Sequence, residues 1–400
     1  MLFSDRIERV CIGSALRALA TLLVLGLGLA AAKAQDAFYA ASPTELVGKP
    51  GTLIRATPIV PPSGAAAAYR ILYRSVGVRR EPIAVSGIII VPQGLPPVGG
   101  WPVVAWAHPT TGVAQHCAPS LDPARYDHIA GLADFLARGY VVAASDYPGL
   151  GTPGFHPYLV GDSQGRAVLD AVRAAMTMPQ VPASPRVVPW GYSQGGHAAL
   201  FAGQIAKSYA PTLQIVGIAA SAPPTELGSL IRADVGSIVG RVLSAYALWS
   251  WSNVYGLPIT SAIDKRVVLI MPRIADTCTK SAHDKLRLVL ADQLFQQNSL
   301  LSRDVTTTQP WRDLIEGNTP GITPPGVPVF LAQGASDKIV RPLITELYSD
   351  VLCSRRRAVR FIMIPGANHE AMGKAATRQA VAWIADRFNG LPPPSDCEAQ

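Results

Sequence analysis

A series of short, continuously apolar runs separated by segments of helical periodicity is the feature that most restricts the fold of this chain. The runs cover residues 103–107, 140–145, 187–190 and 215–220, and a later pair at 329–333 and 360–364 closes the series. Strands that are apolar on both faces are typical of a parallel sheet covered by helices on both sides. We therefore predict an α/β fold built on a mostly parallel sheet.

Three earlier segments follow a different pattern. Residues 52–59, 67–76 and 83–92 are rich in strand-forming residues, and the middle segment places Tyr69, Ile71 and Tyr73 at alternate positions. Such alternation is typical of antiparallel hairpins. We expect these segments to add antiparallel N-terminal strands to the sheet, and a last helix to cover about residues 373–388.

Residues 223–310 interrupt the alternation of strands and helices. Between 227 and 249, apolar residues recur at steps of three and four, which predicts an amphipathic helix pair or one long helix. We predict that 223–310 is a helical insertion and that the core consists of 35–222 and 311–400.

The amino-acid composition excludes some architectures and makes a nucleic-acid partner unexpected. Gly and Pro, at 35 each, exclude a helical bundle or coiled coil as the main architecture. The net charge of +8 comes from 35 Lys and Arg against 27 Asp and Glu. No block of like charges is longer than the three arginines at 355–357, so a nucleic-acid partner is not expected.

The N-terminus has the features of a signal peptide. Three arginines within the first 17 residues precede an uncharged apolar run, 18–32, and Ala32-Lys33-Ala34 offers a cleavage site. The run is shorter than the about 20 residues that span a bilayer. We predict that residues 1–34 are a cleaved signal peptide, that the mature chain has no transmembrane segment, and that it is secreted or periplasmic.

Four cysteines remain once that segment, with Cys11, is set aside: Cys117, Cys278, Cys353 and Cys397. An even number in a chain bound for an oxidising compartment predicts two disulfides. No two of them have the spacing of a structural zinc site. We expect neither a metal ion nor another cofactor.

The pattern G-x-S-x-G occurs twice, at 161–165 and 191–195. A strained, exposed serine on this motif needs a buried strand before it and a helix with small residues after it. Ser193 meets both conditions, with 187–190 before it and 195–200 after it. Ser163 follows a loop rich in Pro and Gly, and we interpret it as a helix N-cap. Ser193 is therefore the predicted nucleophile.

A serine nucleophile needs a histidine base that is oriented by an acid, and in this type of fold the chain order is Ser, acid, His. His369 lies just past the last strand, whereas His283 lies among charged residues of the insertion and is expected at the surface. Asp337 directly follows the strand at 329–333. Asp146 also ends a strand, but it precedes Ser193, and we interpret it as a structural loop acid.

Two backbone N–H groups are needed for the oxyanion of a tetrahedral intermediate. One is expected from Gln194, directly after the nucleophile. The second is expected from the loop that follows 103–107. Since Pro109 has no N–H, Thr110 or Thr111 is the better candidate.

The chain resembles the secretory lipase family, the α/β-hydrolases that include the lipase A enzymes. The motifs that carry the resemblance are YRILYR at 69–74, TTG at 110–112 with CAPS at 117–120, DYPGLG at 146–151, HPY at 156–158 and GYSQGG at 191–196.

The resemblance implies an α/β-hydrolase fold and the same triad of Ser193, Asp337 and His369. It also implies that the insertion 223–310 is a helical cap, or lid, over an acyl-binding pocket. By analogy with the family, Cys117 pairs with Cys278 and Cys353 pairs with Cys397.

The leading hypothesis is a secreted serine carboxylic ester hydrolase, a lipase or esterase that cleaves acylglycerols or similar apolar esters through an acyl-enzyme intermediate. Contact of the cap with a lipid interface is a further hypothesis. Two alternatives stay open, because a triad alone does not select the leaving group. One is a serine peptidase or thioesterase of the same fold, and the other is a non-catalytic binding protein on a hydrolase scaffold.

Overall fold

The structure is a computed structural model that describes residues 37–279, 281, 284–289 and 299–397. The predicted signal peptide, 1–34, and His283 lie outside these residues. Ala37–Tyr39 forms a short 3-10 helix, η1, in a unit with the residues before it. A second compact unit begins at Ala41.

Among the described residues of this unit, ten strands form one mixed sheet. Its strands are β1 (Leu53–Ile59), β2 (Ala65–Val76), β3 (Pro82–Pro92), β4 (Trp101–Ala107), β5 (Val141–Ser145), β6 (Ala183–Tyr192), β7 (Gln214–Ile215), β8 (Ile218–Ser221), β9 (Val329–Gly334) and β10 (Val359–Ile364). Their order is β1-β2-β3-β5-β4-β6-β8-β9-β10, with β7 paired to β6. The pairs β1·β2, β2·β3 and β3·β5 are antiparallel and the others are parallel. The predicted mixture of a parallel sheet and antiparallel N-terminal strands is thus present.

The register of the central strands places their carboxyl ends level with one another. Ala107 at the end of β4 pairs with Ser145 of β5 on one side and with Gly191 of β6 on the other. The loops that follow these strands therefore leave the sheet at one edge, where residues far apart in the sequence can meet.

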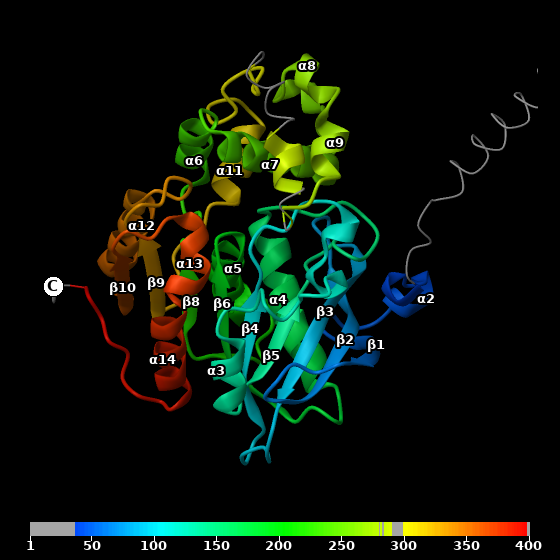
Figure 1. The fold of residues 1–400 in the computed structure, drawn as a ribbon, viewed down its shortest axis with the longest axis vertical. Coiled ribbons are helices and arrows are strands. Elements are labelled where there is room, and N and C mark those ends of the chain that lie inside the picture. Colours follow the sequence, from blue (N-terminus) through cyan, green and yellow to red (C-terminus); the bar gives the residue numbers. More distant parts are fainter. Residues whose placement is uncertain (1–36, 280, 282–283, 290–298, 398–400) are drawn as a thin grey trace, which may run out of the picture. The chain divides into compact units, whose positions relative to one another are not determined.

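Helices cover both faces of the sheet (Figure 1). One apolar cluster joins the sheet to α4 (Gly161–Met176), α5 (Gln194–Tyr209) and α12 (Pro342–Ser354). A second cluster, on the other face, joins it to α3 (Leu132–Ala137), α13 (His369–Ala375) and α14 (Thr377–Phe388). Burial on both faces explains why the central strands are apolar at every position.

The segment between β8 and β9 builds a third apolar cluster from the helices α6 (Leu227–Asp234), α7 (Ile238–Tyr255), α8 (Lys265–Val268), α9 (Met271–Ala275) and α11 (Trp311–Gly317). In Figure 1 these helices gather beyond one end of the sheet. The region 227–249 forms a helix pair, because a new helix starts at α7, where the Ser237 hydroxyl accepts a hydrogen bond from the N–H of Gly240.

The division into core and cap stays a prediction, but packing favours a later boundary than residue 310. Trp311 and Ile315 of α11 are buried in the third cluster together with residues of α6 and α7. None of the helices among the described residues is both long and apolar enough to cross a membrane.

Three local expectations need correction. The predicted strand at 215–220 is two short strands, β7 and β8, and the predicted last helix is preceded by a separate helix, α13. Ser163 is not an N-cap, because α4 begins at Gly161 and its cap residue is Val160. The N–H of Gly161 instead donates to Oδ1 of Asn318, which lies 157 residues later, at 3.0 Å. The side chain of Asn318 therefore accepts a hydrogen bond from the first backbone N–H of α4, which is the capping role that the local sequence predicted for Ser163.

Two disulfides tie peripheral segments to this framework. One joins Cys117 of the 3-10 helix η2 (Gln115–Cys117) to Cys278, and the other joins Cys353 of α12 to Cys397 near the C-terminus. This is the pairing that the resemblance implied.

Candidate active site

Ser193 lies on a sharp turn between β6 and α5. Its backbone has φ 55° and ψ −123°, a conformation that residues with a side chain rarely adopt. Glycines on both sides make this turn possible. A Cβ on Gly191 would lie 2.2 Å from the carbonyl oxygen of Gly195, and a Cβ on Gly195 would lie 1.9 Å from that of Ala107. The turn therefore presses the start of α5 against the end of β4 and projects the serine from the strand end.

The three residues predicted as a triad form a continuous chain of hydrogen bonds. Ser193 Oγ lies 2.8 Å from His369 Nε2, and His369 Nδ1 lies 2.7 Å from Oδ2 of Asp337. A carboxylate only accepts hydrogen bonds, so Nδ1 carries the ring proton and Nε2 is free to accept the serine proton. This arrangement can activate a serine hydroxyl as a nucleophile.

Asp337 is held rigidly at the end of β9. Its Oδ1 accepts hydrogen bonds from the N–H groups of Ile339 and Val340, each at 2.9 Å. Its Oδ2 accepts a further bond from Nε2 of Gln333 at 3.1 Å. The side chain is buried, and these donors compensate for the loss of water around the carboxylate. Asp337 can thus orient the imidazole of His369 with little freedom.

Asp146, the other strand-end acid, has different partners. Its carboxylate accepts bonds from the Ser86 hydroxyl at 2.6 Å and from the N–H of Ser120 at 2.8 Å. The side chain is buried at the carboxyl end of β5 and holds the segment around Ser120 against β3. These contacts fit the interpretation of Asp146 as a structural acid.

The predicted oxyanion residues lie at the same strand edge. Gln194 is the first residue of α5, and the first N–H groups of a helix have no acceptor within the helix. Thr110 and Thr111 follow β4 and are held by Thr279. The Thr279 hydroxyl donates to the carbonyl of Thr110 at 2.8 Å, and its N–H donates to that of Thr111 at 3.1 Å. The role of these residues as oxyanion donors stays a prediction.

His156 was quoted in the sequence only as part of a motif, yet it contacts the predicted oxyanion residue. Its Nδ1 donates to the carbonyl of Pro148 at 2.9 Å, and its Nε2 lies 3.1 Å from Nε2 of Gln194. Burial lowers the pKa of His156 to about 3, so the ring is neutral and Nε2 accepts from the Gln194 amide. This contact fixes the Gln194 side chain at the start of α5.

Tyr192 is a second residue whose contact the sequence did not predict. Its hydroxyl donates to the backbone carbonyl of His369, and the two rings lie 5.2 Å apart between centroids. The only signal in the sequence is that Tyr192 precedes the nucleophile. The contact couples the elbow to the loop that carries the predicted base.

A small apolar cavity opens beside the nucleophile, between the sheet edge and the cap. It is lined by Ser193 and Gln194, by Ile339 and Val340, and by apolar residues of α6 and α7 that include Leu227, Ile231, Leu243, Ala247 and Trp251. We name it the acyl cavity. Its volume is about 60 Å³.

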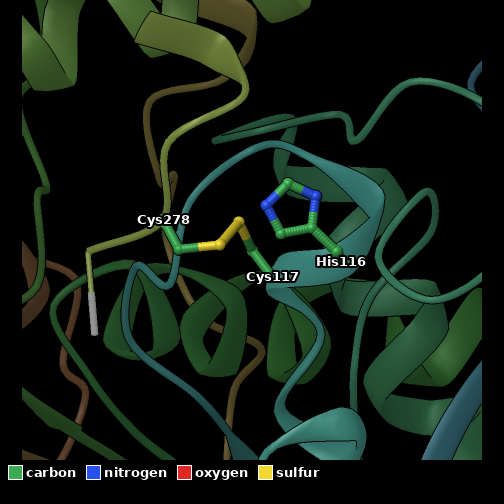
Figure 2. A group of neighbouring side chains, drawn as sticks. All are labelled: His116, Cys117 and Cys278. Carbon is green, nitrogen blue, oxygen red and sulfur yellow. A yellow bond between two sulfur atoms is a disulfide. The ribbon is translucent and has the colours of Figure 1, made fainter. Parts of the chain in front are cut away.

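One group among the described residues has the ligand atoms for a metal ion: His116, Cys117 and Cys278 (Figure 2). The two sulfur atoms are bonded to each other, as the yellow bond in Figure 2 shows, so neither is a thiolate that could bind a metal. His116 alone would not hold an ion.

A family model described as secretory lipase matches residues 125–396, more than half of the chain. The chain belongs to the secretory lipase family. Lipase A of Moesziomyces aphidis is 26% identical over 370 residues, which cover 83% of this chain and 74% of that protein. A probable inactive lipase of Mycobacterium tuberculosis is 25% identical over 355 residues, covering 81% of this chain and 74% of that protein.

Among solved structures, the chain is similar to Candida antarctica lipase A, with a TM-score of 0.76 at 21% identity over 91% of this chain and 88% of that one. This likeness confirms the predicted α/β-hydrolase fold. Family membership confirms that the chain is a secreted carboxylic ester hydrolase of the lipase and esterase class.

Proposed function

We propose that this secretory lipase relative cleaves carboxylic esters with a short acyl chain, using Ser193 as nucleophile, His369 as base and Asp337 as the orienting acid. The observation that carries the proposal is the unbroken set of hydrogen bonds from Ser193 Oγ through His369 to Asp337 at a strained elbow. One relative in the family is named a probable inactive lipase, so the activity is argued from the residues of this chain.

The mechanism follows from the positions of these atoms. Ser193 Oγ attacks the ester carbonyl carbon while His369 Nε2 takes its proton, and Asp337 stabilises the resulting imidazolium. The negative oxygen accepts hydrogen bonds from the N–H of Gln194 and of Thr110 or Thr111. The C–O bond to the alcohol then breaks as His369 protonates the leaving oxygen. A water molecule, deprotonated by His369, attacks the acyl enzyme, and the carboxylic acid leaves as Ser193 regains its proton.

The size of the acyl cavity supports a short acyl group. An apolar cavity of about 150 Å³ holds one benzene molecule, whereas the acyl cavity measures about 60 Å³. Apart from a few polar residues such as Ser193, Gln194 and Ser244, the lining is made of aliphatic and aromatic side chains, which suit an apolar acyl chain. An acetyl or propionyl group fits this space, and a long chain requires the cap to move.

The proposal is tested with p-nitrophenyl esters of two to sixteen acyl carbons. We expect kcat/KM to be highest for two to four carbons and to fall steadily beyond six. Ser193→Ala should lower kcat by at least about 10⁴-fold, since loss of the nucleophile removes the acyl-enzyme route. Turnover by Ser193→Ala equal to that of the wild type would refute the mechanism, and a maximum at twelve to sixteen carbons would refute the assignment of the acyl cavity.

We also propose that the chain is exported with residues 1–34 as a cleaved signal peptide. The basic start, the apolar run at 18–32 and the small residues at Ala32 and Ala34 support this. N-terminal sequencing of the exported protein should begin at residue 35. A mature chain that begins at Met1 would refute the cleavage.

Contact of the cap with a lipid interface is a further part of the proposal. Five large apolar side chains among the described residues of the cap segment are exposed: Ile238 at 36%, Val239 at 47%, Leu269 at 81%, Leu286 at 55% and Val289 at 43%. The double variant Leu269→Ser, Leu286→Ser should bind less to phosphatidylcholine vesicles in a sedimentation assay. The control is Leu95→Ser, at a leucine that is 92% exposed in the loop between β3 and β4. Equal loss in both variants would contradict a role of the cap.

A further inference from the structure

The segment 156–158, the HPY motif of the sequence, contacts two residues from which the oxyanion hydrogen bonds are expected. His156 Nε2 lies 3.1 Å from Nε2 of Gln194. The hydroxyl of Tyr158 lies 2.8 Å from Oγ1 of Thr110, and one of these hydroxyls donates to the other. We name residues 156–158 the bridge segment.

Both contacts of the bridge segment lie in the interior. His156 and Gln194 are each 1% exposed, and Tyr158 is 2% exposed. Burial raises the pKa of Tyr158 to about 12, so its hydroxyl keeps its proton at neutral pH. Hydrogen bonds are stronger where water is excluded, and breaking one leaves a buried polar group unpaired. The two contacts therefore restrict the side chains of Gln194 and Thr110.

The bridge segment is fastened to α7 of the predicted cap. The N–H of Tyr158 donates to Oγ of Ser250 at 2.8 Å, and the Ser250 hydroxyl donates to the carbonyl of His156 at 2.6 Å. Nε1 of Trp251 donates to the carbonyl of Tyr158 at 2.8 Å. Ser250 and Trp251 are both buried. Three hydrogen bonds thus join α7 to the backbone of the two residues that contact the predicted oxyanion residues.

Thr110 depends on such contacts more than Gln194 does. Gln194 begins α5, and the hydrogen bonds of the helix fix its backbone. Thr110 lies in the loop after β4, where its carbonyl accepts a hydrogen bond from the Thr279 hydroxyl at 2.8 Å. Thr279 and α7 both belong to the predicted cap segment, 223–310. The bonds that hold the carbonyl and the side chain of Thr110 therefore both lead back to this segment.

Two other contacts of the bridge segment reach neither oxyanion residue. Nε2 of Gln164 in α4 donates to the carbonyl of Pro157 at 3.3 Å, and the rings of Tyr158 and Tyr246 lie 6.1 Å apart between centroids. Contacts of this kind stabilise the fold without touching the reaction. A segment with a purely structural role would affect the free energy of unfolding when altered and would leave kcat unchanged.

We propose that His156 and Tyr158 are positioning residues of the oxyanion site and that α7 holds them in place. They act through Gln194 and Thr110, whose N–H groups donate to the negative oxygen that forms when Ser193 attacks the ester. Since that oxygen is negative only in the transition state and the tetrahedral intermediate, weaker positioning lowers kcat and kcat/KM by the same factor and leaves KM unchanged. This rests on the proposed function.

The first test changes α7 and none of the site residues. Ser250→Ala removes two of the three hydrogen bonds to the bridge segment, and Ser250 does not line the acyl cavity. The control is Ser252→Ala, because Ser252 is also buried on α7 and its hydroxyl donates to the carbonyl of Leu257 at 2.6 Å. For p-nitrophenyl acetate, Ser250→Ala should lower kcat about fivefold or more at constant KM, the effect of one average hydrogen bond or more. Ser252→Ala should keep kcat within about twofold of the wild type, and urea unfolding should show that both variants are folded.

The second test removes the contact between the two hydroxyls. Tyr158→Phe keeps the ring that lines the acyl cavity, and Thr110→Val keeps the backbone N–H. Each variant should lower kcat about fivefold with little change in KM. The double variant loses the same single bond, so it should also lower kcat about fivefold, whereas independent effects would multiply to about 25-fold. The control is Tyr348→Phe, a buried tyrosine of α12 whose hydroxyl donates to the carbonyl of Gly321 at 2.8 Å, and it should keep the wild-type kcat.

The outcomes separate this proposal from the proposed function. No hydrolysis of p-nitrophenyl acetate by the wild type would refute the proposed function itself. An active wild type, with either Ser250→Ala or Tyr158→Phe as active as its control, would overturn only the positioning role. A loss of about 25-fold in the double variant would overturn it as well, because the two hydroxyls would then act independently.

Discussion

Removal of the Cys117–Cys278 disulfide should reduce both the stability and the activity of this enzyme. The bond joins Cys117 of η2 to Cys278 in the predicted cap, and Cys117 lies five residues after Gly112 of the predicted oxyanion loop. Thr279, the neighbour of Cys278, holds the carbonyls of Thr110 and Thr111. A Cβ on Gly112 would lie 2.6 Å from the Cys117 sulfur, so this loop packs directly on the disulfide. The perturbation is the double substitution Cys117→Ala, Cys278→Ala.

The expected loss of stability follows from the length of chain that each disulfide closes. Cys117 and Cys278 are 161 residues apart, and Cys353 and Cys397 are 44 residues apart. Loop-closure entropy gives about 5 kcal/mol for the longer loop and about 4 kcal/mol for the shorter one, as upper estimates. The double substitution Cys353→Ala, Cys397→Ala is a matched control, because the expected loss of stability is of similar size. Its disulfide joins α12 to the C-terminal segment and not to the predicted oxyanion loop.

The two double variants should differ in kcat, because only the Cys117–Cys278 disulfide packs against the predicted oxyanion loop. Loss of one oxyanion donor costs about 10²- to 10³-fold in kcat, so a loop that is loosened but not removed should cost about tenfold to 10²-fold. Urea unfolding and hydrolysis of p-nitrophenyl acetate would be measured for both variants at a temperature where both remain folded. The control should keep its kcat within about twofold of the wild type. A Cys117→Ala, Cys278→Ala enzyme with wild-type kcat would refute the idea that this bond positions the oxyanion loop.

Three further predictions concern single groups. Asp337→Asn should lower kcat by about 10⁴-fold with little change in KM, because an amide no longer selects the productive tautomer of the histidine; a loss below tenfold in steady-state kinetics would contradict the orienting role. Burial lowers the pKa of His156 to about 3 and that of His197 to about 4. Below pH 6.5 these two histidines therefore bind more protons in the unfolded chain than in the folded one. The free energy of unfolding should fall as the pH falls from 6.5 to about 4. Burial raises the pKa of Asp170 to about 6, which offsets one histidine, and the net slope should be about 1.4 kcal/mol per pH unit; urea unfolding at pH 6.5 and 4.5 that shows no decrease would contradict it. Gly195→Ala places a Cβ 1.9 Å from the carbonyl oxygen of Ala107 at the end of β4 and should destabilise the fold by about 1–3 kcal/mol. Thermal unfolding measures this loss, and an unchanged Tm would contradict the close packing at the elbow.

Features that depend on local pattern could be predicted from the sequence. The elbow at Ser193 was identified because a strained turn needs glycines and small residues at fixed positions, and the close approaches at Gly191 and Gly195 show the physical reason. The placement of Asp337 and His369 near Ser193 could be expected because a parallel sheet exposes the residues that follow its strands at one edge, and the structure hydrogen-bonds the three side chains in series. Their catalytic roles stay predictions. The fold class followed in the same way, since double-sided burial leaves continuous apolar runs.

Features that depend on contacts across the chain could not be predicted. The contact between His156 and Gln194 joins residues 38 positions apart through two side chains whose types are common in loops and helices. The end of the cap cannot be predicted from Trp311 and Ile315, because these residues are apolar whether they pack on the cap or on the sheet. Neither case leaves a periodic signal in the sequence.

Asn318 shows why the cap and the core have to be considered together. Its Oδ1 caps α4 at Gly161, and its carbonyl accepts a hydrogen bond from Nε2 of buried His197 on α5, the helix that starts at the nucleophile, at 2.7 Å. One residue at the end of α11 thus satisfies polar groups on both helices beneath the elbow. Movement of the cap to admit a longer acyl chain would have to preserve these bonds or leave buried polar groups unpaired, at a cost of about 1–3 kcal/mol each. The base of the cap at α11 is therefore expected to stay in place, and any opening that enlarges the acyl cavity has to come from α6 and α7.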